Sequence, residues 1–208
     1  MTPEASSPRG YHHGNLRNEL LDTAEAQLAE LGIEELSLRA LARTIGVSQT
    51  APYRHFRDKN ELLAALATRG YRTLLGSLES AAEAAGDDPR TRMRAFAGSY
   101  VKYAISHPEL FKLMFGPILQ PQENYPALLQ ASRDTYELVR RIMRDGIDRG
   151  LFRDEDDHYM ANAGWSGIHG LAILKVDSPD LFERHVDLER QIDLDVRIFL
   201  AGIAAGTS

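Results

Sequence analysis

Five side chains that can hydrogen-bond or carry charge lie close together near position 50: Gln49, Thr50, Tyr53, Arg54 and His55. Amide, hydroxyl and guanidinium groups of this kind pair with base edges and phosphates in the major groove of DNA. Their chemistry therefore indicates a nucleic-acid contact, provided that one folded element presents them on a common surface.

The segment from Ser37 to Phe56 predicts such an element, because it has the spacing of a helix-turn-helix. Ser37 is placed to cap a first helix that ends near Ile45. Gly46 can adopt the positive φ of a sharp turn, and Ser48 is placed to cap a second helix that ends near Phe56. We expect the polar side chains of this second helix to face outward.

The charge distribution agrees with this interpretation, although the formal net charge of the chain is −6. Between positions 39 and 59, five cations are opposed by Asp58 alone: Arg39, Arg43, Arg54, Arg57 and Lys59. Isolated cations near helix starts position a protein on the DNA backbone. We therefore expect Arg39, Arg54 and Lys59 to contact phosphates.

The same segment, continued through Leu63, resembles the DNA-binding domain of the TetR (tetracycline repressor) family over roughly the first 70 residues. In that family the third helix enters the major groove, and the resemblance implies recognition or phosphate contact at Tyr53, at the pair His55-Phe56 and at Lys59. The full set of expected DNA contacts is Arg39, Ser48, Gln49, Thr50, Tyr53, Arg54, His55 and Lys59.

Two shorter matches, and one departure, refine the resemblance. The prefix 11–17, and Trp165 followed by His169-Gly170, resemble a TetR subgroup whose C-terminal domain is named for a Trp-His-Gly signature. Pro52 stands where many family members carry leucine. Because proline removes an amide donor, we expect the recognition helix to begin tight or distorted.

Apolar residues recur at helical spacing through the rest of the chain, and no stretch alternates as a half-buried strand does. The sequence therefore predicts an all-α fold of about nine helices, with a three-helix DNA-binding domain at 11–57, a regulatory and dimerisation domain at 58–208, and disorder at 1–10. The expected helices lie at about 15–31, 37–45, 48–56, 58–85, 88–107, 108–115, 126–149, 154–178 and 187–204.

Large aromatic and sulfur-containing side chains recur through the second domain. They are consistent with a core alone, or with a cavity partly lined by them in which His169, Tyr100 or Tyr136 supplies a polar handle. The resemblance favours the cavity, since TetR-like C-terminal domains enclose an effector pocket. The candidate ligand contacts are Phe96, Tyr100, Tyr103, Phe111, Met114, Tyr136, Met143, Trp165 and His169.

The last two expected helices carry small and apolar residues at helical spacing, which favours a dimer contact, with packing inside one subunit as the alternative. The residues are Ala161, Gly164, Gly167 and Ile168 on one helix and Ile192, Val196, Phe199 and Ile203 on the other.

Other chemistry finds little support. The chain contains no cysteine, and neither His12-His13 nor the cluster 154–158 has a second matched pair of metal ligands. The motif at 164–168 lacks the glycine spacing and the preceding strand of a serine nucleophile elbow. We expect no enzyme activity, no metal and no cofactor. No apolar run approaches the length of a membrane span, which predicts a cytoplasmic protein.

Together these observations predict a homodimeric, sequence-specific DNA-binding regulator. Family analogy suggests a repressor that a small, largely apolar effector releases from an inverted-repeat operator. A helical ligand-binding or scaffold protein that does not bind DNA is the alternative.

Overall fold

The computed structural model describes residues 16–206, and these are helical apart from connecting segments and one isolated bridge between Phe152 and Ala204. The predicted all-α fold is confirmed. The expectations for 1–10, for an Asn15 cap, for His12-His13 and for the prefix 11–15 fall outside the described residues. No helix in the described range is long and apolar enough to cross a membrane.

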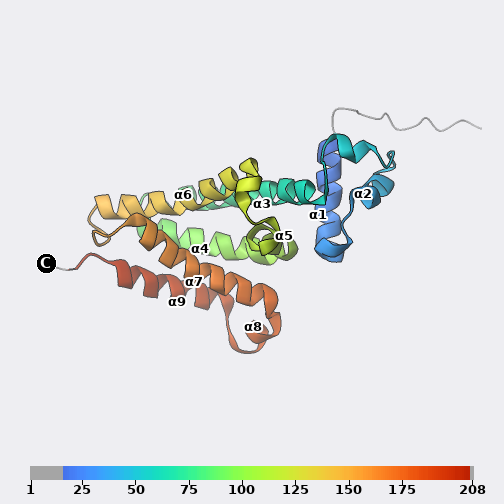
Figure 1. The fold of residues 1–208 in the computed structure, drawn as a ribbon. Helices are drawn as coiled ribbons and strands as arrows, with labels where there is room; N and C mark the ends of the chain where they lie inside the picture. The colour runs from blue at the N-terminus through green and yellow to red at the C-terminus, as the bar shows by residue number, and fades with distance from the viewer. Residues whose placement is uncertain (1–15, 207–208) are drawn as a thin grey trace, which may run out of the picture. The chain divides into compact units, whose positions relative to one another are not determined.

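The helices follow one another along the chain as Figure 1 labels them. The α-helices are α1 (Leu16–Glu35), α2 (Leu38–Ile45), α3 (Lys59–Ala84), α4 (Pro89–Ser106), α5 (Pro108–Phe115), α6 (Pro126–Asp148), α7 (Asp157–Asp177), α8 (Pro179–His185) and α9 (Leu188–Ile203). Three short 3-10 helices are η1 (Ala51–Arg54), η2 (Pro117–Leu119) and η3 (Gln122–Asn124).

The chain divides between Leu62 and Leu63 into two compact units. This division falls inside α3, so the first turn of that helix belongs to the first unit and the remainder to the second. The sequence analysis placed the boundary after residue 57, where the helix-turn-helix ends.

The first unit is built by the local signals that the sequence carries. Ser37 accepts a hydrogen bond from the Ala40 amide at 3.1 Å and starts α2, while Gly46 ends that helix with φ +83°. Gly32, with φ +78°, interrupts the helical geometry of α1 at the position where the first helix was expected to end. Both turns depend on a backbone conformation that glycine adopts readily.

The expected third helix, 48–56, is where the prediction was wrong. The structure has the single 3-10 turn η1, and Ser48 does not cap it, because its hydroxyl lies 3.2 Å from that of Thr50. Pro52 lies in the first turn and cannot donate a backbone hydrogen bond. The tight helical geometry that was expected only at the start of this helix therefore covers most of the recognition element.

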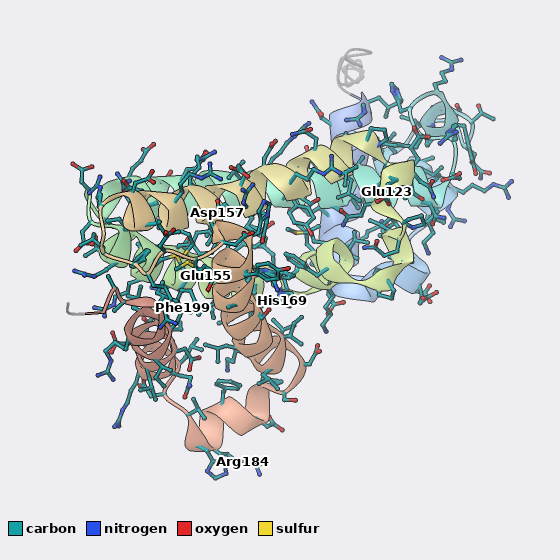
Figure 2. The ribbon with its side chains drawn as sticks, turned by 60° about the vertical axis from the view of Figure 1, so that its left-hand side comes forward. Glu123, Glu155, Asp157, His169, Arg184 and Phe199 are labelled. Atoms are coloured by element: carbon teal, nitrogen blue, oxygen red, sulfur yellow. The ribbon has the colours of Figure 1, made fainter. Side chains whose placement is uncertain are left out.

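The second unit packs around α4, which contacts α6, α7 and α9 (Figure 1). Asp88 caps α4 by accepting from the Arg90 amide, and Pro89 occupies its first turn, as the sequence indicates. At the start of α7, the Asp157 carboxylate binds Arg140 and Arg144 of α6 at 3.1 and 2.5 Å (Figure 2). These ion pairs hold α6 against α7.

Two segments contain helix that the sequence analysis did not predict. Ser178-Pro179 ends α7 as expected, but the proline also begins the short helix α8, because its fixed φ suits a first helical position. The proline-rich connection after α5, expected as a loop, forms η2 and η3. A proline in the sequence can therefore mark the end of one helix and also the start of the next.

Candidate DNA-reading turn and ligand cavity

The side chains expected to read DNA lie on the surface of the first unit. Gln49, Thr50 and Arg54 are exposed, and 47% of the Tyr53 surface is accessible. Ser48 is exposed as well, whereas His55 is half-buried. The turn η1 and the residues just before it thus present amide, hydroxyl and guanidinium groups to solvent together.

Two buried residues anchor this turn. Pro52 is buried, and its carbonyl accepts hydrogen bonds from the amides of His55 and Phe56 at 2.9 and 3.0 Å. Phe56 is 1% exposed, and the Arg17 guanidinium lies 5.2 Å from its ring centroid. Because the anchors point inward, the polar side chains between them are held outward.

The cations of this unit fall into two groups. Arg39, Arg43 and Arg54 are exposed and form no ion pair within residues 16–206. Lys59, by contrast, is half-buried and donates to the Glu34 carbonyl at 3.0 Å. The arginines are therefore open to phosphate, while one donor of Lys59 already serves the end of α1.

The second unit contains a cavity of about 280 Å³. Its wall comes from α3, α4, α5, α6 and α7 and from the connection between α5 and α6. The lining residues are Tyr71, Phe96, Tyr100, Met114, Phe115, Gln120, Gln122, Ser132, Thr135, Tyr136, Val139 and Trp165. None of these side chains carries a charge at neutral pH, and the volume lies near the lower end of the range of small-molecule pockets, about 300 to 1,000 Å³.

A polar network fixes one wall of this cavity. The Trp165 indole donates to the Tyr100 hydroxyl at 3.2 Å, and that hydroxyl lies 2.9 Å from Nδ1 of His169. The tautomer of His169 sets the direction of this second bond, and we assign Nδ1 as the acceptor of the Tyr100 proton. Trp165 and His169, four residues apart on α7, thus hold one hydroxyl on α4.

Burial shifts the proton affinities of this network. It raises the pKa of the Tyr100 hydroxyl well above its usual range, against the hydrogen bond from Trp165. It lowers the pKa of His169, which contacts Phe115 of α5 with ring centroids 4.7 Å apart (Figure 2). Both groups are therefore neutral at pH 7, as the assigned hydrogen bond requires.

Five of the nine candidate ligand contacts line the cavity: Phe96, Tyr100, Met114, Tyr136 and Trp165. The other four lie outside its lining. His169 is hydrogen-bonded to the lining residue Tyr100, and Phe111 packs on the His169 ring. Tyr103 donates to the Gly70 carbonyl at 2.9 Å, and Met143 is completely buried.

Seven lining residues are not among the candidate ligand contacts: Tyr71, Phe115, Gln120, Gln122, Ser132, Thr135 and Val139. A usable signal existed for Thr135, which continues the buried face of α6 set by Leu128, Ala131 and Leu138. A polar residue on such a face calls for a partner. No comparable periodicity marks Gln120 and Gln122, which lie in a connection.

Most residues proposed for a dimer contact are buried within one chain. They are Ala161, Gly164, Ile168, Ile192, Val196 and Ile203. A Cβ at Gly164 would approach the Phe199 ring to 2.9 Å, so α9 packs closely on α7 there (Figure 2). These six residues therefore pack inside one subunit, which is the alternative to a dimer contact that the sequence left open.

A different set of residues on the same two helices is exposed. Gly167 has open space where a Cβ would lie, and four large apolar side chains are accessible: Tyr159 at 75%, Leu174 at 51%, Leu194 at 39% and Ile198 at 63%. Exposed apolar side chains gathered on two neighbouring helices are typical of an interaction surface.

The comparisons with known proteins cover both units. Residues 20–66 match the family model "Bacterial regulatory proteins, tetR family", and residues 93–197 match "Tetracyclin repressor-like, C-terminal domain". The chain is 25% identical to the uncharacterized HTH-type transcriptional regulator YobS of Bacillus subtilis, over 90% of this chain and 93% of that one.

Solved structures agree. A protein of unknown function from Rhodococcus sp. RHA1 is 34% identical with a TM-score of 0.85, over 95% of this chain and all of that one. The TetR family regulator PfmR of Thermus thermophilus is 25% identical with a TM-score of 0.67, over 88% and 97%. With an exposed recognition turn, an all-helical second unit and a family match in each, the chain belongs to the TetR family of DNA-binding transcriptional regulators.

Proposed function

We propose that this regulator is a homodimeric repressor that leaves an inverted-repeat operator when an effector enters the cavity of its second unit. The observation that carries the proposal is the combination, in one chain, of exposed polar groups on a helix-turn-helix and a cavity whose lining carries no charge. Repression rather than activation follows the family resemblance.

Direct reading of bases falls to the recognition turn. Gln49 and Tyr53 are exposed and carry groups that bind base edges, while Arg39 and Arg54, which form no ion pair in the described part of the chain, carry charges suited to phosphates. Ser48, Thr50 and His55 complete the proposed surface, His55 with less exposed area. Lys59 adds a phosphate contact through the donors that Glu34 does not use.

Dimerisation is proposed through the exposed apolar face of α7 and α9, which consists of Tyr159, Gly167, Leu174, Leu194 and Ile198. Two such helices from each protomer form a four-helix interface. A two-fold axis through it pairs the two recognition turns, which is why the expected operator is an inverted repeat.

Signal transfer is proposed to follow α3. This helix carries Lys59 in the first unit and Tyr71, a lining residue of the cavity, in the second. A ligand that displaces Tyr71 therefore acts on an element that both units share. The regulator acts by binding alone, as a repressor of this family does, with no catalytic step and no cofactor.

A gel shift tests DNA reading. Wild-type protein is expected to retard fragments that flank its own gene in the presence of competitor DNA. Gln49→Ala should lose this selectivity, while Gln130→Ala, which removes an exposed glutamine of α6, should retain it. Retention by Gln49→Ala at wild-type affinity would remove this residue from the reading surface, and failure of wild type to select any fragment would reject the function.

Linkage tests the effector role. A compound that quenches Trp165 and releases operator must bind more weakly when operator is present, by the same factor by which it weakens DNA binding. A coupling free energy of about 2.7 kcal/mol corresponds to about 100-fold. Equal ligand affinity with and without operator would reject the proposed coupling.

A further inference from the structure

The hydroxyl protons on the cavity wall are already committed to partners inside the protein. Five lining residues carry a hydroxyl. Tyr71 donates to the Met114 carbonyl, Tyr136 to the His158 carbonyl, Thr135 to the Ala131 carbonyl, Ser132 to Gln122 or the Leu129 carbonyl, and Tyr100 to His169. These oxygens can therefore accept a hydrogen bond from a ligand but have no proton left to donate.

Thr135 supplies a buried hydroxyl oxygen on α6 that can accept a hydrogen bond. It is 7% exposed, and its proton goes to Ala131 at 3.0 Å, as in many helical threonines. Neither lone pair of its oxygen receives a hydrogen bond within the described residues. Tyr100, by comparison, already accepts from Trp165.

The donors on the wall are the Trp165 indole and the amide groups of Gln120 and Gln122. The Trp165 indole is bound to Tyr100, and the Gln122 side chain accepts from Ser132 through its carbonyl oxygen. Gln120 has a free amide but is exposed, so water satisfies it without a ligand. Both amide groups lie in the connection between α5 and α6, whereas a ligand donor that reaches α6 finds the buried oxygen of Thr135.

We propose that the cavity takes an uncharged molecule with an aromatic or alicyclic body and one hydroxyl group, which donates to Oγ1 of Thr135. The ring stack of Phe96 and Tyr100, with centroids 6.2 Å apart, supplies the apolar surface for the body. A ligand carboxylate is disfavoured, because the lining offers no cation to compensate for its burial. This inference rests on the proposed function, in which the cavity is the effector site.

Calorimetric titration of the full chain at pH 7 with three matched probes tests the ligand class. The probes are 4-tert-butylphenol, its methyl ether and 4-tert-butylbenzoate. We expect the phenol to bind about fivefold more tightly than the ether, the usual worth of one hydrogen bond. The benzoate should bind at least about 100-fold more weakly than the phenol.

Thr135→Val separates the hydrogen bond from the shape of the cavity. The variant should lower phenol affinity about fivefold and leave the ether unchanged, so the preference disappears. Thr68→Val is the matched control, because Thr68 is also buried, also donates to the carbonyl four residues earlier, and does not line the cavity. Thr135→Ser, which keeps the hydroxyl, should keep the preference.

Several outcomes would overturn the inference: equal binding of phenol and ether, tighter binding of the benzoate, binding of none of the probes, or a phenol preference that survives Thr135→Val. The wild-type comparison decides the matter even if the valine variant does not fold. Phenol selectivity through Thr135 without any release of operator would leave the ligand class standing and reject the effector role instead.

Discussion

The two units of this regulator handle their polar groups in opposite ways. The recognition turn exposes the side chains of Gln49, Tyr53 and Arg54, which have no side-chain hydrogen bond or ion pair within residues 16–206, and in the proposed function DNA supplies their partners. On the cavity wall, in contrast, the hydroxyl protons of Tyr100 and Thr135 are bound to groups inside the protein. Only the lone pairs of these two oxygens remain for a ligand. A surface that reads DNA can be fully open, whereas a buried wall must be satisfied even when it is empty.

The largest expected effect concerns the surface that we propose pairs two copies of the chain. Ile198→Arg introduces a charge on the exposed face of α9 and should yield a monomer, with operator affinity at least about 100-fold lower, because burying an unpaired charge is costly. Light scattering and a gel shift measure both effects. Ile105→Arg, at an exposed apolar position of α4, should leave the dimer intact. A dimeric Ile198→Arg would exclude this face.

A smaller effect is expected inside the recognition turn. Tyr53→Ala should weaken binding to the operator by about 1 to 3 kcal/mol and leave nonspecific binding nearly unchanged. Titrations on operator and on scrambled duplexes measure the two affinities. Equal losses on both would mean that Tyr53 contacts the backbone rather than the bases.

Arg54 and Lys59 should differ in their effect on stability, because only the Lys59 side chain has a hydrogen-bond partner in the described part of the free protein. Arg54→Ala should weaken binding to all sequences alike and reduce the salt slope by about one, without changing stability. Lys59→Ala should also lower the thermal stability, because it removes the hydrogen bond to the Glu34 carbonyl. An unchanged melting temperature for Lys59→Ala would show that this bond contributes nothing to the fold.

The smallest effect belongs to the second unit and depends on pH. Burial lowers the pKa of His169, so in the unfolded chain this residue binds a proton more readily than in the folded one. Its contribution to stability is present above the unfolded pKa of about 6.5 and is lost as the pH falls toward the lowered value. Melting temperatures between pH 7.5 and pH 5.5 measure the loss.

The matched variant is His169→Asn, which retains an acceptor for the Tyr100 hydroxyl but does not titrate. It should lose less stability than wild type over the same interval. An identical loss in both proteins would assign the pH dependence to other groups.

The sequence predicted the structure best where a residue's own side chain or backbone sets the local geometry. Ser37, Gly46 and Asp88 form the caps and turn that their chemistry indicates. The turn η1 is shorter than the predicted helix at 48–56. Pro52 affects the whole element, whereas the sequence predicted an effect at its start only. Short-range signals therefore located an exposed polar turn but overestimated its helical regularity.

The cavity could be predicted only in part, since helical spacing identifies a buried side but does not distinguish a packed core from an empty volume. Phe96 and Met143 both lie on buried faces, yet Phe96 lines the cavity and Met143 does not. The same limit applies to the surface proposed for dimerisation. Val196 and Ile198 are two positions apart on α9, and helical spacing favoured Val196, which is buried within the chain, over the exposed Ile198.

Selection of binding sites from a random DNA library by the wild-type protein tests the central claim most directly. The account predicts an enriched inverted repeat whose half-site centres lie about one helical turn apart, roughly 34 to 36 Å, or a multiple of it, and no such enrichment by Tyr53→Ala. Enriched sequences without two-fold symmetry, or no enrichment over the starting library, would contradict it.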